Sequence, residues 1–114
     1  MVNIIDDLSE LNIPVYVEGD APETLPEEYF TISEDSTSDN VCADNEPKSI
    51  LYEFTIKWYT TNPNNLYNGL IQAMTLLRKK RYITTGVGYS NRTYQDKWFS
   101  RQADIKKIES LQGV

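Results

Sequence analysis

The chain of 114 residues contains no histidine and a single cysteine, Cys42. Without histidine, the commonest general base and the commonest metal ligand are both missing. Cys42 therefore has no histidine with which to form a catalytic pair, and an ordinary structural zinc site is excluded as well. A lone cysteine also excludes an internal disulfide. These absences predict a protein that is not an enzyme, with no catalytic, cofactor-binding or metal-binding residues and no cofactor.

Long apolar segments are also missing. No run approaches the roughly 20 residues that span a bilayer, and the opening residues MVNIIDDLSEL are acidic where a signal peptide would be basic. These features and the single cysteine predict a protein kept in a reducing cytoplasm, without a membrane partner. The hydrophobic content of 39% and the thirteen aromatic residues, eight of them tyrosine, are typical of a folded chain. We expect one domain over residues 1–114.

Positive charge is absent from the first 47 residues, which hold thirteen acidic residues and no lysine or arginine. Residues 48–114 hold eleven basic and four acidic residues, so the two parts carry −13 and +7, which sum to the net charge of −6. A subunit polarised in this way can dock onto a copy of itself head to tail, and such contacts form rings or tubes rather than two-fold dimers. The alternative is that the fold intermixes the two parts.

Hydrophobic periodicity predicts two helices. Residues 3–11 carry apolar side chains at helical spacing after the N-cap candidate Asn3. Residues 62–80 repeat this pattern over a longer stretch, with Asn62 as N-cap and Pro63 at the first helical position. The basic run at its end, residues 78–81, complements the negative end of a helix, and a nucleic-acid contact is the alternative explanation.

Alternating and β-branched residues predict strands at 15–17, 29–33, 50–60, 82–90 and 93–105. In the strand 50–60, large apolar residues alternate with polar ones, so one of its faces is expected to be buried. Residues 34–48, EDSTSDNVCADNEPK, are predicted to form a long acidic loop, with a hairpin arm as the folded alternative. The end of the chain, about residues 108–114, is expected to fray. The predicted fold class is α+β, a mostly antiparallel sheet of four to five strands with two helices packed on one face.

The order of these elements resembles one group of proteins over about residues 1–105. The resemblance is carried by the strand YFTIS, the acidic ADNEP, the strand YEFTIKWYT, the helix NPNNLYNGLIQAMTLL and the aromatic-rich pair of segments 82–89 and 94–99. In this order they resemble the tail-completion proteins of long-tailed bacteriophages and prophages, also called tail-terminator or head–tail joining proteins.

The resemblance implies a single α+β domain that acts without catalysis and assembles into a ring, typically a hexamer, at the head-proximal end of the phage tail. Such a ring stops polymerisation of the tail tube protein and docks onto the head connector protein. The implied location is the virion, and the host cytoplasm during assembly. DNA would only pass through the lumen, without sequence-specific binding, and a negative lumen would keep the duplex from sticking.

In the same proteins an extended loop or hairpin between two strands commonly reaches onto a neighbouring subunit. The matching stretch here is residues 34–48. The acidic residues to which the resemblance gives an interface role are Glu34, Asp35, Asp39, Asp44 and Glu46, and their expected partners by charge complementarity are Lys79, Lys80, Arg81 and Arg92. The basic run would then lie outside the ring or between subunits, because in the lumen it would hold DNA.

Two other functions remain open from the sequence. The acidic residues of 18–46 can mimic DNA phosphates and inhibit a nuclease, provided that the basic residues stay off that face. The other is a small regulatory module that binds a protein or a metabolite, although no residue cluster predicts a ligand pocket. A nucleic-acid binder is disfavoured, because the net charge of −6 opposes attraction to phosphate.

Overall fold

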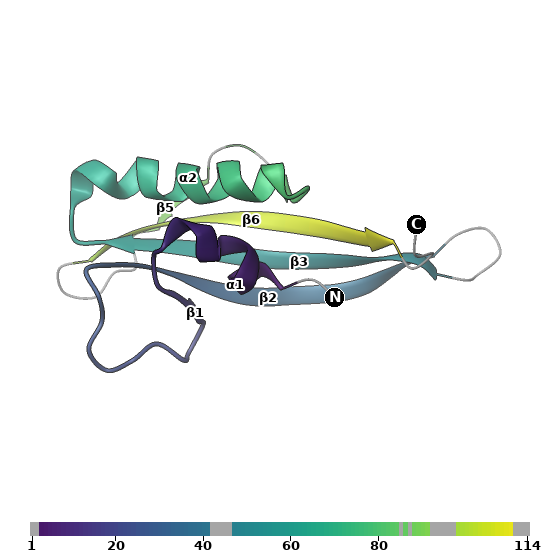
Figure 1. The fold of residues 1–114 in the computed structure, drawn as a ribbon, viewed down its shortest axis with the longest axis horizontal. Helices are drawn as coiled ribbons and strands as arrows, with labels where there is room; N and C mark the ends of the chain where they lie inside the picture. The colour runs from purple at the N-terminus through teal and green to yellow at the C-terminus, as the bar shows by residue number, and fades with distance from the viewer. Residues whose placement is uncertain (1–2, 42–46, 85, 87, 92–97, 111–114) are drawn as a thin grey trace.

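The molecule is elongated, 52 × 27 × 26 Å, with one twisted sheet and two helices over one of its faces (Figure 1). The structure, a computed structural model, describes residues 3–41, 47–84, 86, 88–91 and 98–110. In chain order the elements are α1 (Ile4–Leu8), the 3-10 helix η1 (Ser9–Leu11), β1 (Val15–Val17), β2 (Glu28–Val41), β3 (Pro47–Thr60), the 3-10 helix η2 (Pro63–Asn65), α2 (Leu66–Lys79), β4 (Ile83–Thr84), β5 (Tyr89–Asn91) and β6 (Phe99–Ser110). This arrangement confirms the predicted α+β class and the mostly antiparallel sheet.

The strands are ordered β1-β2-β3-β6-β4 across the sheet, and β5 pairs with β6 on the same side as β4. Six strands therefore occupy five positions. β1 runs parallel to β2, and all the other pairs are antiparallel. Because β6 pairs with β3, the strands from the N-terminal part of the chain form one side of the sheet and those from the C-terminal part form the other.

The buried face of β3 anchors the core, as its alternation predicts. Trp58 is fully buried, and its ring centroid lies 4.6 Å from that of Phe30 on β2. The indole Nε1–H of Trp58 donates to the carbonyl oxygen of Asn65 at 3.1 Å, so its polar group is satisfied. Burying a side chain of this size contributes about 1.5–3 kcal/mol. The other buried apolar residues of this core are Ile4, Leu8, Ile32, Phe54, Ile56, Leu70, Ala73, Met74, Leu77, Tyr82, Ala103 and Ile105.

The expected acidic loop is instead mostly strand, which corrects the sequence prediction in favour of its folded alternative, the hairpin arm. Residues 34–41 continue β2, and residues 47 and 48 begin β3. The strand propensity of Ser, Asp and Asn is low, but pairing with the long ladder of β3 outweighs it. Residues 42–46, between the two strands, lie outside the described residues.

The C-terminal strands also differ from their predicted bounds. β6 begins later than the expected strand 93–105 and includes residues 108–110, which were expected to fray. Pairing of Ile108 with Leu51, near the far end of β3, holds this segment. The expected strand 82–90 is divided into β4 and β5, and Gly86 and Gly88 between them have positive φ angles of 64° and 76°.

Gly69 of α2 packs directly on the indole of Trp58. A Cβ atom added to Gly69 would lie 2.0 Å from Cε2 of Trp58. We expect Gly69→Ala to lower the free energy of unfolding. Overpacking costs about 1–3 kcal/mol, and at so short a distance this cost should exceed the ~1 kcal/mol that alanine gains in helix propensity. Urea denaturation followed by tryptophan fluorescence measures the change. The exposed Gln72→Ala on the same helix should stay within about 0.5 kcal/mol of the wild type, and equal stability of Gly69→Ala would contradict the close packing.

Candidate assembly surfaces

The sheet order sorts much of the charge by edge. Residues 15–41, which comprise β1, β2 and their connection, carry eight acidic residues and no basic one: Glu18, Asp20, Glu23, Glu27, Glu28, Glu34, Asp35 and Asp39. On the other side, the end of α2 with β4 and β6 carries seven basic residues, Arg78, Lys79, Lys80, Arg81, Arg101, Lys106 and Lys107, against Asp104 and Glu109. We call these the acidic edge and the basic edge. They are separated because β3 lies between them.

The helical layer mixes the charges instead. Lys80 at the end of α2 forms ion pairs with Glu10 and, at 4.0 Å between Nζ and Oδ1, with Asp7 of α1. On the face of the sheet away from the helices, Lys57 of β3 forms an ion pair with Glu18, 2.8 Å between Nζ and Oε1, so one acid of the acidic edge is also paired within the subunit. Each pair joins an acid of the first 47 residues to a base of the later part. The polarity of the sequence is therefore kept at the sheet edges and lost over α1.

These contacts raise the pKa values of both lysines. The largest cause is the hydrogen bond to Glu10 for Lys80 and the hydrogen bond to Glu18 for Lys57, and desolvation opposes it in both. Both ammonium groups therefore remain charged at physiological pH, and Lys80 is engaged within its own subunit. Lys79 and Arg81, from the same predicted set, are exposed.

Arg81 closes α2 in a left-handed conformation, with φ of 72°. The Tyr82 N–H donates to the Leu77 carbonyl oxygen at 2.9 Å and the Arg81 N–H to that of Arg78 at 3.0 Å, the two bonds of a Schellman cap. Glycine is the usual residue at this position, because a Cβ atom costs roughly 1–2 kcal/mol in the left-handed region. Arg81 therefore carries a conformational cost that glycine at this position would avoid.

The acidic arm, which we define as residues 33–41 of β2, holds Glu34 and Asp35 in fixed positions. A register shift at this point marks a β-bulge. The Thr55 hydroxyl donates to Asp35 Oδ2 at 2.6 Å, and the Thr37 hydroxyl donates to Glu34 Oε2 at 2.9 Å. Glu34 and Asp35 are nevertheless exposed, so the fold orients these two carboxylates and leaves them accessible to a partner.

The structure keeps the described acidic and basic candidates apart. Asp39 lies on β2 opposite Ile50, in line with the rest of the acidic arm. The strand β3 separates this arm from the basic edge within one subunit. The remaining candidates from the sequence, Asp44, Glu46 and Arg92, lie outside the described residues.

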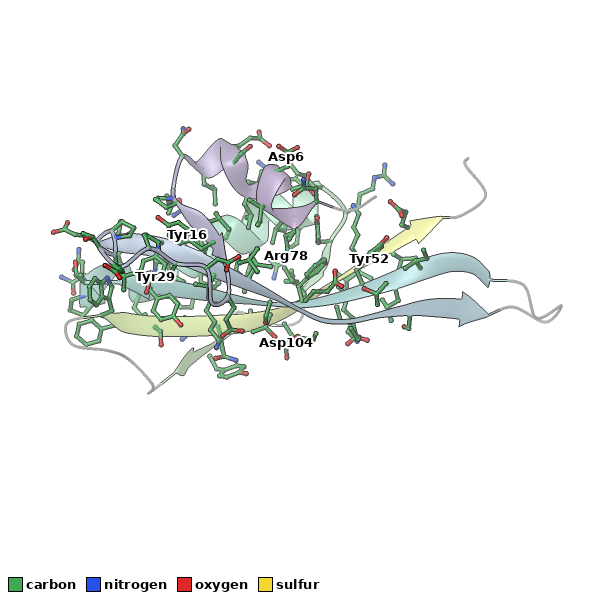
Figure 2. The ribbon with its side chains drawn as sticks, turned by 90° about the horizontal axis from the view of Figure 1, so that it is seen from below. Asp6, Tyr16, Tyr29, Tyr52, Arg78 and Asp104 are labelled. Atoms are coloured by element: carbon green, nitrogen blue, oxygen red, sulfur yellow. The ribbon has the colours of Figure 1, made fainter. Side chains whose placement is uncertain are left out.

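The face of the sheet away from the helices carries a tyrosine cluster that the sequence analysis missed. Figure 2 shows this face on the side of Asp104, opposite Asp6 of α1. Tyr29 and Tyr59 stack with ring centroids 4.7 Å apart, and Tyr16 meets Tyr29 edge-on at 5.9 Å. Strand alternation was the signal that could have found them, because each has neighbours in sequence that face the core.

A cavity of about 430 Å³ opens beside this cluster, beneath the connection between β1 and β2. Tyr29, Tyr59 and Trp98 line it together with Glu18 and Glu23. Burial, then the neighbouring phenols of Tyr59 and Tyr16, raise the pKa of Tyr29, so this phenol stays neutral at physiological pH. The cavity therefore presents aromatic carbon with carboxylates at its rim.

Within the part of the chain that the structure describes, no group of three or more Asp, Glu or Cys residues is placed to hold a metal ion. The described helices include none with the length and apolar character needed to cross a bilayer. No protein-family model matches the chain, and no curated protein matches it in sequence. Inference about function therefore starts from charge and geometry.

The ion pair of Lys80 predicts a stability change with a defined pH range. Lys80→Gln should lower the melting temperature at pH 7, because it removes the link from the end of α2 to Asp7 of α1 and Glu10 of η1. Because the pKa of Lys80 is raised in the folded state, the pair contributes its full stability at pH values below the pKa of lysine in the unfolded chain, about 10.4. This contribution disappears as the pH rises through the pKa of Lys80 in the folded protein. The difference between variant and wild type in thermal melts should thus shrink at high pH. Lys79→Gln is the matched control, and a Lys80→Gln protein that melts like the wild type at pH 7 would contradict the role of the pair.

The conformation of Arg81 predicts that one substitution stabilises the protein. Arg81→Gly should raise the free energy of unfolding by about 1 kcal/mol, because glycine adopts a positive φ without strain. Arg81→Lys keeps the Cβ atom and the charge and should stay near the wild type. Urea denaturation at neutral pH measures both variants. Loss of stability in Arg81→Gly would show that the arginine side chain contributes to the fold itself.

Proposed function

We propose that this chain is a non-enzymatic structural protein of a phage tail, which forms a ring at the head-proximal end, terminates the tail tube and joins it to the head connector. The observation that carries the proposal is the opposite charge of the two sheet edges. A cyclic ring needs two different and complementary patches on each subunit, and the acidic and basic edges supply them.

The long hairpin of β2 and β3 supports the same proposal. Its far part extends beyond both helices (Figure 1), so the acidic arm projects to where a neighbouring subunit can meet it. This is the stretch to which the resemblance to tail-completion proteins gives an interface role. The exposed carboxylates of Glu34 and Asp35 and the exposed guanidinium of Arg81 supply opposite charges for that contact.

The uncovered sheet face supports docking of a further protein. Tyrosine is enriched at interfaces because its ring is apolar and its hydroxyl group forms hydrogen bonds. The cluster around Tyr29 and the adjacent cavity give this face aromatic surface of that kind. We assign it to contact with the tail tube protein or the connector protein. DNA only passes through the lumen, because a subunit with a net charge of −6 repels phosphate.

The acidic edge also favours a second candidate, an inhibitor that mimics DNA phosphates. Eight acidic residues without a base within residues 15–41 suit such mimicry. An inhibitor acts as a small species that binds a nuclease, whereas a terminator associates with tubes. The two candidates are therefore separated by one assay.

That assay is capping of tail tubes. Purified protein added to tubes that lack a terminator should appear as a ring on one end in negative-stain electron microscopy, and should stop growth when tube protein is added. High salt should weaken ring formation, because it screens the contact between charged edges. Protein that stays small, leaves tubes growing and inhibits a nuclease would contradict the proposal and support the second candidate.

Charge-swap variants test whether the two edges meet. Reversal on the acidic arm, Glu34→Lys with Asp35→Lys, should abolish ring formation, and so should Lys106→Glu with Arg81→Glu on the basic edge. An equimolar mixture of wild type with either variant should remain impaired, whereas a chain carrying all four changes should regain rings. Arg81→Gly should form rings less well than Arg81→Lys despite its expected greater stability. Ring formation by all of these variants would contradict a role for the edges.

A further inference from the structure

The sheet has two strand edges that no other strand covers in the described part of the chain. β1 pairs with β2 only from Phe30 to Ile32, so the acidic arm pairs on one side alone, with β3. β4 pairs with β6 only at residues 105 and 106, and β5 only at residues 100–102, so the outer side of β6 from residue 107 on is also uncovered. Exposed strand edges are templates for pairing with another chain.

Backbone hydrogen bonds and the strand register show which N–H and C=O groups point outward on β2. The Phe30 N–H donates to the Pro14 carbonyl oxygen, and the Ile32 carbonyl oxygen accepts from the Glu18 N–H, both at 2.9 Å. The backbone N–H and C=O groups of Phe30 and Ile32 therefore point away from β3. Alternation along an antiparallel ladder makes Glu34 point the same way. Beyond the bulge, Thr37 and Asp39 lie opposite Tyr52 and Ile50, which point toward β6, so their N–H and C=O groups also point outward.

The same alternation applies to β6. Tyr52 lies opposite Lys107 and turns its backbone groups toward it, so the next residue, Ile108, turns its N–H and C=O groups outward. The side chain of Ile108 is 48% exposed. Each edge therefore offers backbone donors and acceptors, which must bond either to water or to another strand.

The charges favour contact between an acidic arm and a β6 edge, and disfavour contact between two edges of the same kind. The acidic arm carries Glu34, Asp35 and Asp39 and no base, so two arms repel each other. The uncovered end of β6 follows Lys106 and Lys107, and its only acid is Glu109. Like edges are disfavoured, whereas an acidic arm beside β6 of another copy brings opposite charges together.

Strand direction also fits repeated addition of copies. β2 and β6 both run antiparallel to β3, so they run parallel to each other. A second copy rotated about an axis along the strands places its acidic arm beside β6 of the first, in parallel, and leaves its own β6 for a third copy. This contact is heterologous and keeps every subunit pointing the same way, as a ring on a tube end requires.

We propose that the partner of the acidic arm is a second copy of this chain, whose β6 edge adds to β2 as a parallel strand. The inference rests on the ring proposed above and names its contact. Thr37 and Ile108 supply outward backbone groups, and Lys106 of one copy lies near Asp35 of the next. The sheet thus continues from subunit to subunit.

Proline at an outward position tests this pairing. Thr37→Pro removes one outward N–H without removing a donor from the ladder with β3, so folding should be kept. Thr37→Val is the matched control, because it loses the hydroxyl and retains the N–H. Both variants lose the hydroxyl bond to Glu34, so their difference isolates the outward N–H. We expect Thr37→Pro to self-associate about tenfold or more weakly than Thr37→Val in light scattering over a concentration range. Ile108→Pro, on the opposite edge, should weaken self-association as Thr37→Pro does. It serves as the test if circular dichroism shows that Thr37→Pro is misfolded.

The outcomes separate this inference from the proposed function. Folded proline variants that form rings as the wild type does would overturn strand pairing and leave the terminator function standing. Rings that both proline variants lose, but that never cap tail tubes, would support strand pairing and overturn the terminator function. Wild-type protein that forms no assembly, alone or on tubes, would overturn both.

Discussion

Pairing of β3 with β6 determines where everything else in this molecule lies. It joins residues far apart in the sequence, and it places the acidic strands on one side of the sheet and the basic strand on the other. If β6 had paired with the outer side of β2 instead, Lys106 and Lys107 would lie beside the acidic arm of their own subunit. The charges would then cancel internally, and no complementary edges would remain for another copy. The buried face of β3 also holds Trp58 under α2, so the position of β3 determines both the core and the separation of the charges.

The two layers of the protein treat charge differently. Over the helical face, Lys80 pairs with Asp7 of α1 and Glu10 of η1, which adds to the burial of Ile4 and Leu8 in holding this short helix on α2. At the acidic edge, the carboxylates of Glu34 and Asp35 receive hydrogen bonds from neutral hydroxyl groups, which orient them without neutralising them. Lys57 of the same subunit attracts Asp35 but forms its ion pair with Glu18. Among the described residues, no buried side-chain polar atom lacks a hydrogen-bond partner. The carboxylates of Glu34 and Asp35 are exposed, so an external partner can reach them.

Local sequence signals were sufficient for the elements that they control. The apolar stripe predicted α2, although the Asn62-Pro63 start opens the 3-10 helix η2 and α2 begins at Leu66. The strict alternation of residues 50–60 predicted the buried face of β3. The acidic arm was predicted as a loop, with a hairpin arm as the alternative, because its Ser and Asp residues favour turns and only pairing with β3 makes it extended. Likewise, the ion pair of Lys80 with Glu10 depends on how α1 crosses α2, which no local pattern encodes. The interface roles of Asp44, Glu46 and Arg92 stay predictions, since these residues lie outside the described part.

Contact between the acidic edge of one copy and the basic edge of the next is tested most directly by zero-length cross-linking of assembled protein. Rings would be formed from equal amounts of isotopically light and heavy chains, treated with a carbodiimide that joins touching carboxylates and amines, and analysed by mass spectrometry. We predict mixed light–heavy cross-links between Lys106 and Glu34 or Asp35, while Lys57 and Glu18, 2.8 Å apart in one subunit, give unmixed ones. Cross-links of Lys106 confined to single chains, in rings that show the Lys57–Glu18 product, would contradict a contact between the two edges.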